Sequence, residues 1–97
     1  MRVRWSGRSL RNLQSIRDFI SKNNPVNAEK FIIDMFDSVE SRLKHFPKSG
    51  RVIPEKGDRK FREIIHGNYR IMYKIEIEML TIVTVRNAKQ SFSGKEI

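Results

Sequence analysis

The spacing of the apolar residues changes once along the chain, and this change constrains the fold more than any other feature. From Leu10 to Phe46 the apolar side chains recur every three or four residues, which is the period of an amphipathic helix. From Phe61 onward the period becomes two, which is typical of a strand. The sequence therefore predicts a helical first half and a sheet-forming second half.

Two helices are predicted in the first half, on either side of a turn at Asn23-Asn24-Pro25. The first runs from about residue 8 to residue 22. Asn24 can cap the second helix with its side-chain oxygen, and Pro25 suits the first helical position because no N–H donor is needed there. The second helix should end near Phe46, since a proline follows it. So short a turn predicts an antiparallel helix hairpin.

Four strands are predicted around this hairpin. Residues 2–5 alternate polar and apolar side chains and suit a short strand. Residues 61–66 and 69–76 are joined by Gly67-Asn68, a dipeptide that favours a two-residue hairpin turn. Residues 80–86 are apolar on both faces and therefore belong inside the sheet. Alternation divides the strand 69–76 into two faces. The apolar face is made by Tyr69, Ile71, Tyr73 and Ile75. The second face is made by Arg70, Met72, Lys74 and Glu76.

These elements predict an α+β fold with the order β-α-α-β-β-β, in a single domain over residues 1–97. The first strand must return to the sheet of the others, because alone it has no partner, and the helix hairpin covers one face of a small, mainly antiparallel sheet. Residues 47–60 are predicted to form a loop with one extended piece at Val52-Ile53. Residues 87–97 are predicted to form a polar tail. The residues expected to be largely buried are Trp5, Leu13, Ile16, Ile20, Phe31, Met35, Val39, Tyr73, Ile82 and Val85.

Composition narrows the function classes. The chain has no cysteine and two histidines, so it has no disulfide framework, no thiol nucleophile and little material for a metal site. Twenty Lys and Arg against eleven Asp and Glu give a net charge of +9, which predicts an anionic partner. No apolar run is long enough to span a bilayer, and we expect a cytoplasmic domain that needs no cofactor and does not bind a membrane.

The residues that could carry chemistry lie on the predicted strands. The chain has no Gly-x-Ser-x-Gly turn and no glycine-rich phosphate loop. Cleavage of a phosphodiester would need a proton acceptor and a proton donor, and Glu63 and His66 are the candidates. Alternation puts Glu63 on the face opposite Arg62 and His66, which makes a poor acid–base set. The cations that could bind a target or a partner are Arg62, Arg70 and Arg86, which we expect on one cationic strand face, and Lys89 in the tail that follows.

Several short motifs occur together in one order along nearly the whole chain. They are Val3-Arg4-Trp5-Ser6, Asn24-Pro25, Gly50-Arg51, Pro54-Glu55, Arg62-Glu63-Ile64, Tyr69-Arg70-Ile71-Met72-Tyr73 and Ile82 to Gln90. In this order the chain resembles toxins of the RelE/ParE superfamily, which belong to type II toxin–antitoxin modules and are often called plasmid stabilisation proteins. The resemblance implies a sheet with a two-helix hairpin. It also implies a cognate antitoxin with an acidic segment that folds as it binds.

The superfamily has two activities, and this chain resembles the ParE branch more closely. RelE-like members are metal-independent endoribonucleases that cut mRNA in the ribosome, whereas ParE-like members inhibit DNA gyrase without being hydrolases themselves. Arg70 matches an arginine that RelE-like members place on the scissile phosphate, although many ParE-like members also carry it. Many relatives have histidine at the position of Asn87, and asparagine takes up no proton at neutral pH. The nearest tail aromatic, Phe92, has no proton to exchange.

The expectation is therefore a growth-inhibiting, gyrase-directed toxin and not an enzyme. The first alternative is a RelE-like, ribosome-dependent endoribonuclease with Arg70 on the phosphate and Glu63 or His66 as base. A second alternative is a basic nucleic-acid-binding module without toxicity, whose affinity would fall steeply with salt.

Overall fold

The computed structural model describes residues 1–97 and confirms the predicted order of elements, with one added short strand. The elements are β1 (Arg2–Trp5), α1 (Gly7–Ser21), α2 (Pro25–His45), β2 (Arg51–Val52), β3 (Phe61–His66), β4 (Tyr69–Ile75), β5 (Met79–Asn87) and the 3-10 helix η1 (Gly94–Glu96). The added strand β2 lies one residue before the extended piece expected at Val52-Ile53.

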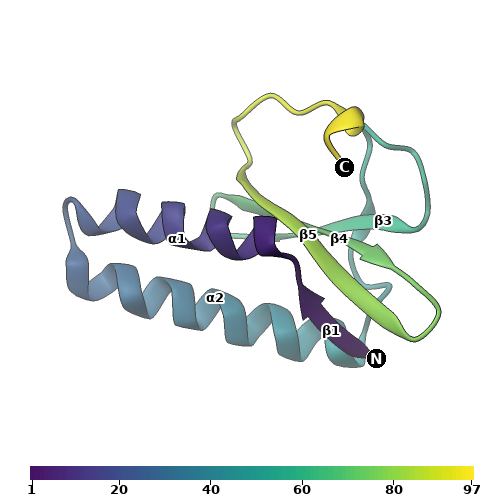
Figure 1. Cartoon of the computed structure of the whole chain (residues 1–97), viewed down its shortest axis with the longest axis horizontal. Helices are drawn as coiled ribbons and strands as arrows, with labels where there is room; N and C mark the ends of the chain where they lie inside the picture. Colours follow the sequence, from purple (N-terminus) through teal and green to yellow (C-terminus); the bar gives the residue numbers. More distant parts are fainter.

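Both helices begin at side-chain caps. The Ser6 hydroxyl accepts a hydrogen bond from the N–H of Ser9 at 3.0 Å, which satisfies a free donor of the first turn of α1. The Asn24 side chain accepts from the N–H of Asn27, with Pro25 at the start of α2 as expected. The caps fix where the two helices start, and the short turn between them makes the hairpin antiparallel (Figure 1).

The five strands form one mixed sheet in the order β1-β5-β4-β3-β2. β1 pairs parallel with β5, and the other neighbours are antiparallel. The apolar strand β5 therefore lies in the interior, as its composition predicts. The register between β4 and β5 shifts between Met72 and Tyr73, so that Tyr73 faces Ile82. This irregularity leaves Val83 as the extra residue of β5.

The helix hairpin covers one face of the sheet (Figure 1). The core lies between them and contains Leu13, Ile16, Met35, Val39, Leu43, Ile64, Ile71, Tyr73, Leu80, Ile82 and Val85. Seven of the ten residues expected in the core are buried. Trp5, Ile20 and Phe31 are only half-buried, because they pack at the margin of the core. Trp5, on an edge strand, stacks on Phe36 with the ring centroids 4.7 Å apart.

The second face of the sheet is partly covered too, which the alternating pattern did not predict. Met72 is fully buried and Arg70 is 7% exposed. Residues 88–97, the C-terminal segment, do not extend into solvent as a polar tail but fold back over this face (Figure 1). A Cβ on Gly94 would lie 2.2 Å from the carbonyl oxygen of Glu55, so this close approach requires glycine.

Tyr73 joins the loop after α2 to the sheet. Its buried hydroxyl donates a hydrogen bond to the carbonyl of Pro47 at 2.7 Å and accepts one from the N–H of Gly50 at 3.0 Å. Burial raises the pKa of the Tyr73 hydroxyl. A Cβ on Gly50 would approach that oxygen to 2.6 Å. The loop can therefore pack against Tyr73 only with glycine at position 50.

None of the helices combines the length and the apolar character that a membrane span requires.

Candidate functional site

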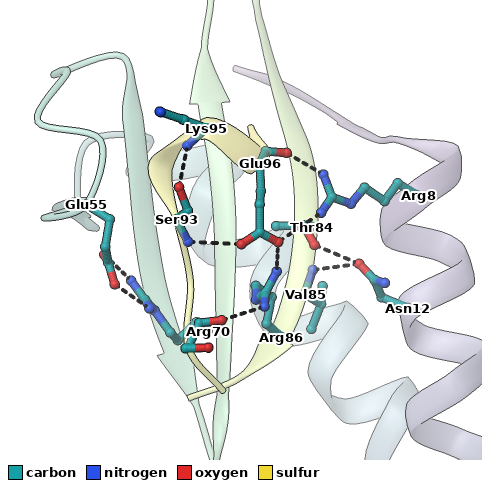
Figure 2. Close-up of polar contacts among 11 residues, drawn as sticks. Arg8, Asn12, Glu55, Arg70, Thr84, Val85, Arg86, Ser93, Lys95 and Glu96 are labelled. Atoms are coloured by element: carbon teal, nitrogen blue, oxygen red, sulfur yellow. Dashed lines mark hydrogen bonds and ion pairs between the residues drawn. The ribbon is translucent and has the colours of Figure 1, made fainter. Parts of the chain in front are cut away.

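Arg70 lies near the start of β4, on the sheet face opposite the helices, and all three of its guanidinium nitrogens are hydrogen-bonded. Nε donates to Glu63 at 2.7 Å, while Nη1 and Nη2 donate to the two carboxylate oxygens of Glu55 at 3.0 and 2.8 Å (Figure 2 shows the pair with Glu55). Glu63 is 1% exposed and also pairs with Arg51 at 2.6 Å. Two arginines and two glutamates thus form a closed network.

The network lowers the pKa of Glu55 and raises the pKa of Arg70. The hydrogen bonds from Arg70 lower the pKa of Glu55 to about 2. The hydrogen bonds to Glu55 in turn raise the pKa of Arg70 above its usual value, so both partners are charged at neutral pH. Charges that are buried together stabilise each other only while the set is complete, because removing one partner leaves the other uncompensated.

The C-terminal segment closes over this network. The Phe92 ring lies over two guanidinium groups, with its centroid 5.4 Å from that of Arg70 and 5.0 Å from that of Arg86. Glu96 accepts a hydrogen bond from Arg86 at 2.6 Å, and its main-chain carbonyl accepts one from Arg8 at 2.6 Å (Figure 2). The guanidinium groups of Arg70 and Arg86 are therefore already in contact with the C-terminal segment.

Glu96 also closes a capping box with Ser93. The N–H of Ser93 donates to the Glu96 carboxylate at 2.9 Å, while the Ser93 hydroxyl accepts from the N–H of Lys95 at 3.3 Å. The pKa of Glu96 is lowered, chiefly by this backbone hydrogen bond and next by Arg86. A capping box at so short a helix orders the end of the chain.

The sequence-predicted cations do not share one surface, which corrects the expectation of a single cationic strand face. Arg62 stands opposite Tyr73 in the register, on the helix-facing side of β3, and donates to the carbonyl of Gly50. His66 is on that same side, in edge contact with Phe31. Glu63 is on the other side with Arg70, as alternation predicts. The candidate bases Glu63 and His66 are therefore separated by the sheet.

The remaining predicted positions lie at the end of β5. The side-chain oxygen of Asn87 accepts a hydrogen bond from the N–H of Lys89 at 2.9 Å, and this turn starts the C-terminal segment. Sequence analysis missed the pairing of Glu55 with Arg70 and of Glu96 with Arg86. Glu55 and Arg70 are fifteen positions apart and show no periodic relationship, so the sequence pattern could not pair them. Glu55 was singled out only as part of the Pro54-Glu55 motif. No group of three or more His, Asp or Glu side chains is placed to hold a metal ion.

A shallow groove of about 330 Å³ runs between α1 and the end of β5. It is lined by Asn12, Ser15, Ile16, Phe19, Tyr69, Val85, Arg86, Asn87 and Gln90. Phe19 is 68% exposed at its rim, a large apolar ring in contact with water. Asn12 closes the inner side, since its side-chain oxygen accepts from the N–H of Val85 and from the hydroxyl of Thr84 (Figure 2). The groove thus combines an apolar rim with a cation.

Comparison with known proteins agrees with this architecture. Residues 3–92 match the family model described as the ParE toxin of the type II toxin–antitoxin system parDE. The candidate toxin Y4kP of Sinorhizobium fredii is 33% identical over 86 residues, which cover 84% of this chain and 85% of that protein. A chain from the chromosomal ParDE system of P. aeruginosa has the same fold, with a TM-score of 0.77 at 17% identity over 90% of this chain and 95% of that one. The family match spans most of the chain, and this protein is therefore a toxin of the ParE family of type II toxin–antitoxin systems.

Proposed function

We propose that this toxin inhibits DNA gyrase and that a cognate antitoxin neutralises it. The observation that carries the choice of gyrase over the ribosome is the closed network around Arg70. All three guanidinium nitrogens already donate to Glu55 and Glu63, and these two carboxylates neutralise the charge that would attract a scissile phosphate. Phe92 covers the same group.

Proton transfer supports the same choice. A metal-independent ribonuclease needs an acid and a base next to the group that binds the phosphate. Glu63 is committed to two arginines, and His66 lies across the sheet against Phe31. Asn87 stands where many relatives in the superfamily carry histidine, and its side chain holds a turn. The RelE-like endoribonuclease is therefore the less favoured function.

The groove beside α1 is the surface that best suits the antitoxin. A segment that folds on binding gains its stability from apolar burial and is guided by charge. Phe19 offers the apolar surface and Arg86 lies in the groove wall. Lys89 comes directly before Gln90, which also lines the groove. The net charge of +9 favours an acidic segment.

The test of the target is pulse labelling of DNA and protein synthesis within minutes of inducing the chain without its antitoxin, together with a supercoiling and DNA-cleavage assay on purified gyrase. Gyrase inhibition predicts that DNA synthesis stops first and that linear DNA accumulates in the cleavage assay. If translation stops first and gyrase is unaffected, the toxin is a ribosome-dependent nuclease and the proposal is wrong.

The antitoxin surface is tested with a matched pair of variants. Phe19→Ser removes an apolar ring that is 68% exposed in the groove, and Phe46→Ser removes one that is 66% exposed after α2. Only Phe19→Ser should weaken antitoxin binding, measured by calorimetry with the purified partner. Equal losses for both variants would contradict a site in the groove.

A further inference from the structure

A row of cations crosses the open part of the sheet face opposite the helices. Arg4 of β1 is in register with Thr81 of β5, and Thr81 is in register with Lys74 of β4. Residues in register point to the same side of a sheet, with their Cβ atoms about 5 Å apart. Lys56 reaches the end of this row from the β2–β3 loop, because its ammonium lies over Phe61, the register partner of Lys74. This ammonium is already held by the C-terminal segment, since it donates to the main-chain oxygens of Gly94 and Ile97. We call these residues, Arg4, Lys56, Lys74 and Thr81, the cationic row.

The charges at the β1 end of the row are not neutralised by the protein. Arg4 is exposed and makes no ion pair, and the same holds for Arg2 two residues before it. Lys74 has one ion pair, at 3.9 Å to Glu76, between side chains that are 39% and 48% exposed. Such a surface pair contributes little. The arginines elsewhere on this face, in contrast, are held by Glu55, Glu63 and Glu96.

A buried hydroxyl in the middle of the row has no partner. Thr81 is 7% exposed, and its Oγ1 makes no hydrogen bond. An unsatisfied buried hydroxyl costs free energy, so in most proteins such a group is paired. Its register neighbours are the long, flexible side chains of Arg4 and Lys74. When these two side chains extend toward an anion, the hydroxyl between them becomes available as a donor.

The chemistry of the row favours double-stranded nucleic acid over other anionic polymers. Single strands are bound mainly by stacking bases on free aromatic rings. The one aromatic ring here, Phe61, is already approached by two ammonium groups, Lys56 at 4.8 Å and Lys74 at 5.7 Å. An acidic peptide that folds on binding needs apolar contacts, and none of the exposed large apolar side chains is a register partner of Arg4, Thr81 or Lys74. Phosphate contacts alone are sufficient for a duplex.

We propose that the cationic row binds the phosphate backbone of double-stranded DNA, with Arg4 and Lys74 on phosphate oxygens and the Thr81 hydroxyl between them. The inference rests on the proposed function, because gyrase holds a duplex while it is inhibited. The toxin then contacts both the enzyme and the DNA held by the enzyme. Binding to DNA alone is weak and independent of sequence, as expected for contacts to the backbone.

The test is fluorescence anisotropy of a labelled 20-base-pair duplex titrated with the full chain at several salt concentrations. The double variant Arg4→Gln/Lys74→Gln is compared with Lys22→Gln/Lys30→Gln, which removes the same charge from exposed positions of the helix hairpin. Loss of two phosphate contacts should lower the log–log salt slope by about 1.8 and the affinity by roughly tenfold, whereas the control pair should change neither. Equal effects of the two pairs, or tighter binding of single-stranded DNA or RNA, would overturn the proposal.

Thr81→Val separates the hydroxyl from the charges. The substitution keeps the β-branched shape and removes a group without a partner, so the melting temperature should not fall. DNA affinity should fall by roughly tenfold or more, since a hydrogen bond to a charged phosphate oxygen is lost. Unchanged affinity would exclude Thr81 from the site.

The gyrase assay distinguishes failure of this inference from failure of the proposed function. If the unmodified toxin traps cleaved DNA and Arg4→Gln/Lys74→Gln does so equally well, the row is not a DNA contact although gyrase is the target. If the unmodified toxin does not affect gyrase but binds duplex DNA through the row, the proposed target is wrong. A toxin that does neither contradicts both.

Discussion

Glu55 accepts hydrogen bonds from both terminal nitrogens of Arg70, with oxygen–nitrogen distances of 2.8 and 3.0 Å. The two residues come from a loop and a strand and meet under the C-terminal segment. This bidentate pairing leaves Arg70 as a structural cation, because Glu63 takes its remaining nitrogen. The arginine that suggests phosphate chemistry in the sequence is thus used within the fold.

The Glu55–Arg70 pair should make the protein sensitive to acid. The folded-state pKa of Glu55 is about 2 against its usual 4.5, so the stabilisation is complete above pH 4.5 and is lost as the pH falls from there toward 2. With a side chain 32% exposed, we expect about 1–2 kcal/mol after solvent screening. Urea unfolding of Glu55→Gln from pH 6 to pH 2 should show a flatter dependence than the unmodified chain. Glu29→Gln, at an exposed position of α2, is the control and should leave the dependence unchanged.

Neutralising Arg70 and Glu63, the two buried members of the network, together should be tolerated better than neutralising Arg70 alone. Arg70→Gln leaves Glu63, 1% exposed, with Arg51 alone and should cost about 3–5 kcal/mol of unfolding free energy. The double variant Arg70→Gln/Glu63→Gln buries no unpaired charge and should cost clearly less by denaturant titration. If gyrase is the target, the double variant still inhibits growth. A folded but non-toxic double variant would instead support phosphate binding by Arg70.

Tyr73→Phe should loosen the loop after α2. The variant keeps the ring in the core but leaves the N–H of Gly50 and the carbonyl of Pro47 without their partner. We expect a loss of about 1–3 kcal/mol. Amide exchange at Gly50 should accelerate more than exchange in β4. Uniform acceleration throughout the sheet would show that the hydroxyl has no local role.

Phe31 is half-buried, so the stability cost of truncating it can be compared with that of truncating a fully buried core residue. Ile82 is fully buried in the central strand β5, so Ile82→Ala should cost about 2–5 kcal/mol. Phe31 contacts His66 and Tyr69 at the margin of the core, and part of its ring already meets water. Phe31→Ala should therefore cost less than Ile82→Ala, although the side chain is larger. Thermal unfolding of both variants measures the order, and the reverse order would contradict the assigned burial.

Periodicity identified the elements of this fold because each depends on neighbours close in sequence. The cap at Asn24, the proline after it and the turn at Gly67 act within a few residues, and all appear where predicted. β5 was placed inside the sheet because its apolar residues need cover on both faces. The return of β1 to the sheet follows from the need of an isolated strand for a partner, whereas its parallel pairing with β5 is seen only in the structure.

The candidate site could not be predicted from periodicity in the same way. Alternation separates Glu63 from Arg62 correctly, but it does not show that Glu55 reaches Arg70 from a loop. It also predicts a solvated second face, whereas the C-terminal segment covers Arg70 there.

The sequence by itself determined the helices, the strands and their order, because capping, periodicity and turn chemistry are local. Its short motifs, in their order, carried the resemblance to the toxin superfamily. Only the tertiary structure decided which cations are free. Arg70 and Arg86 are paired with glutamates from other segments, while Arg4 makes no ion pair. The physical reason is that ion pairing acts through space, between residues that only the folded chain brings together.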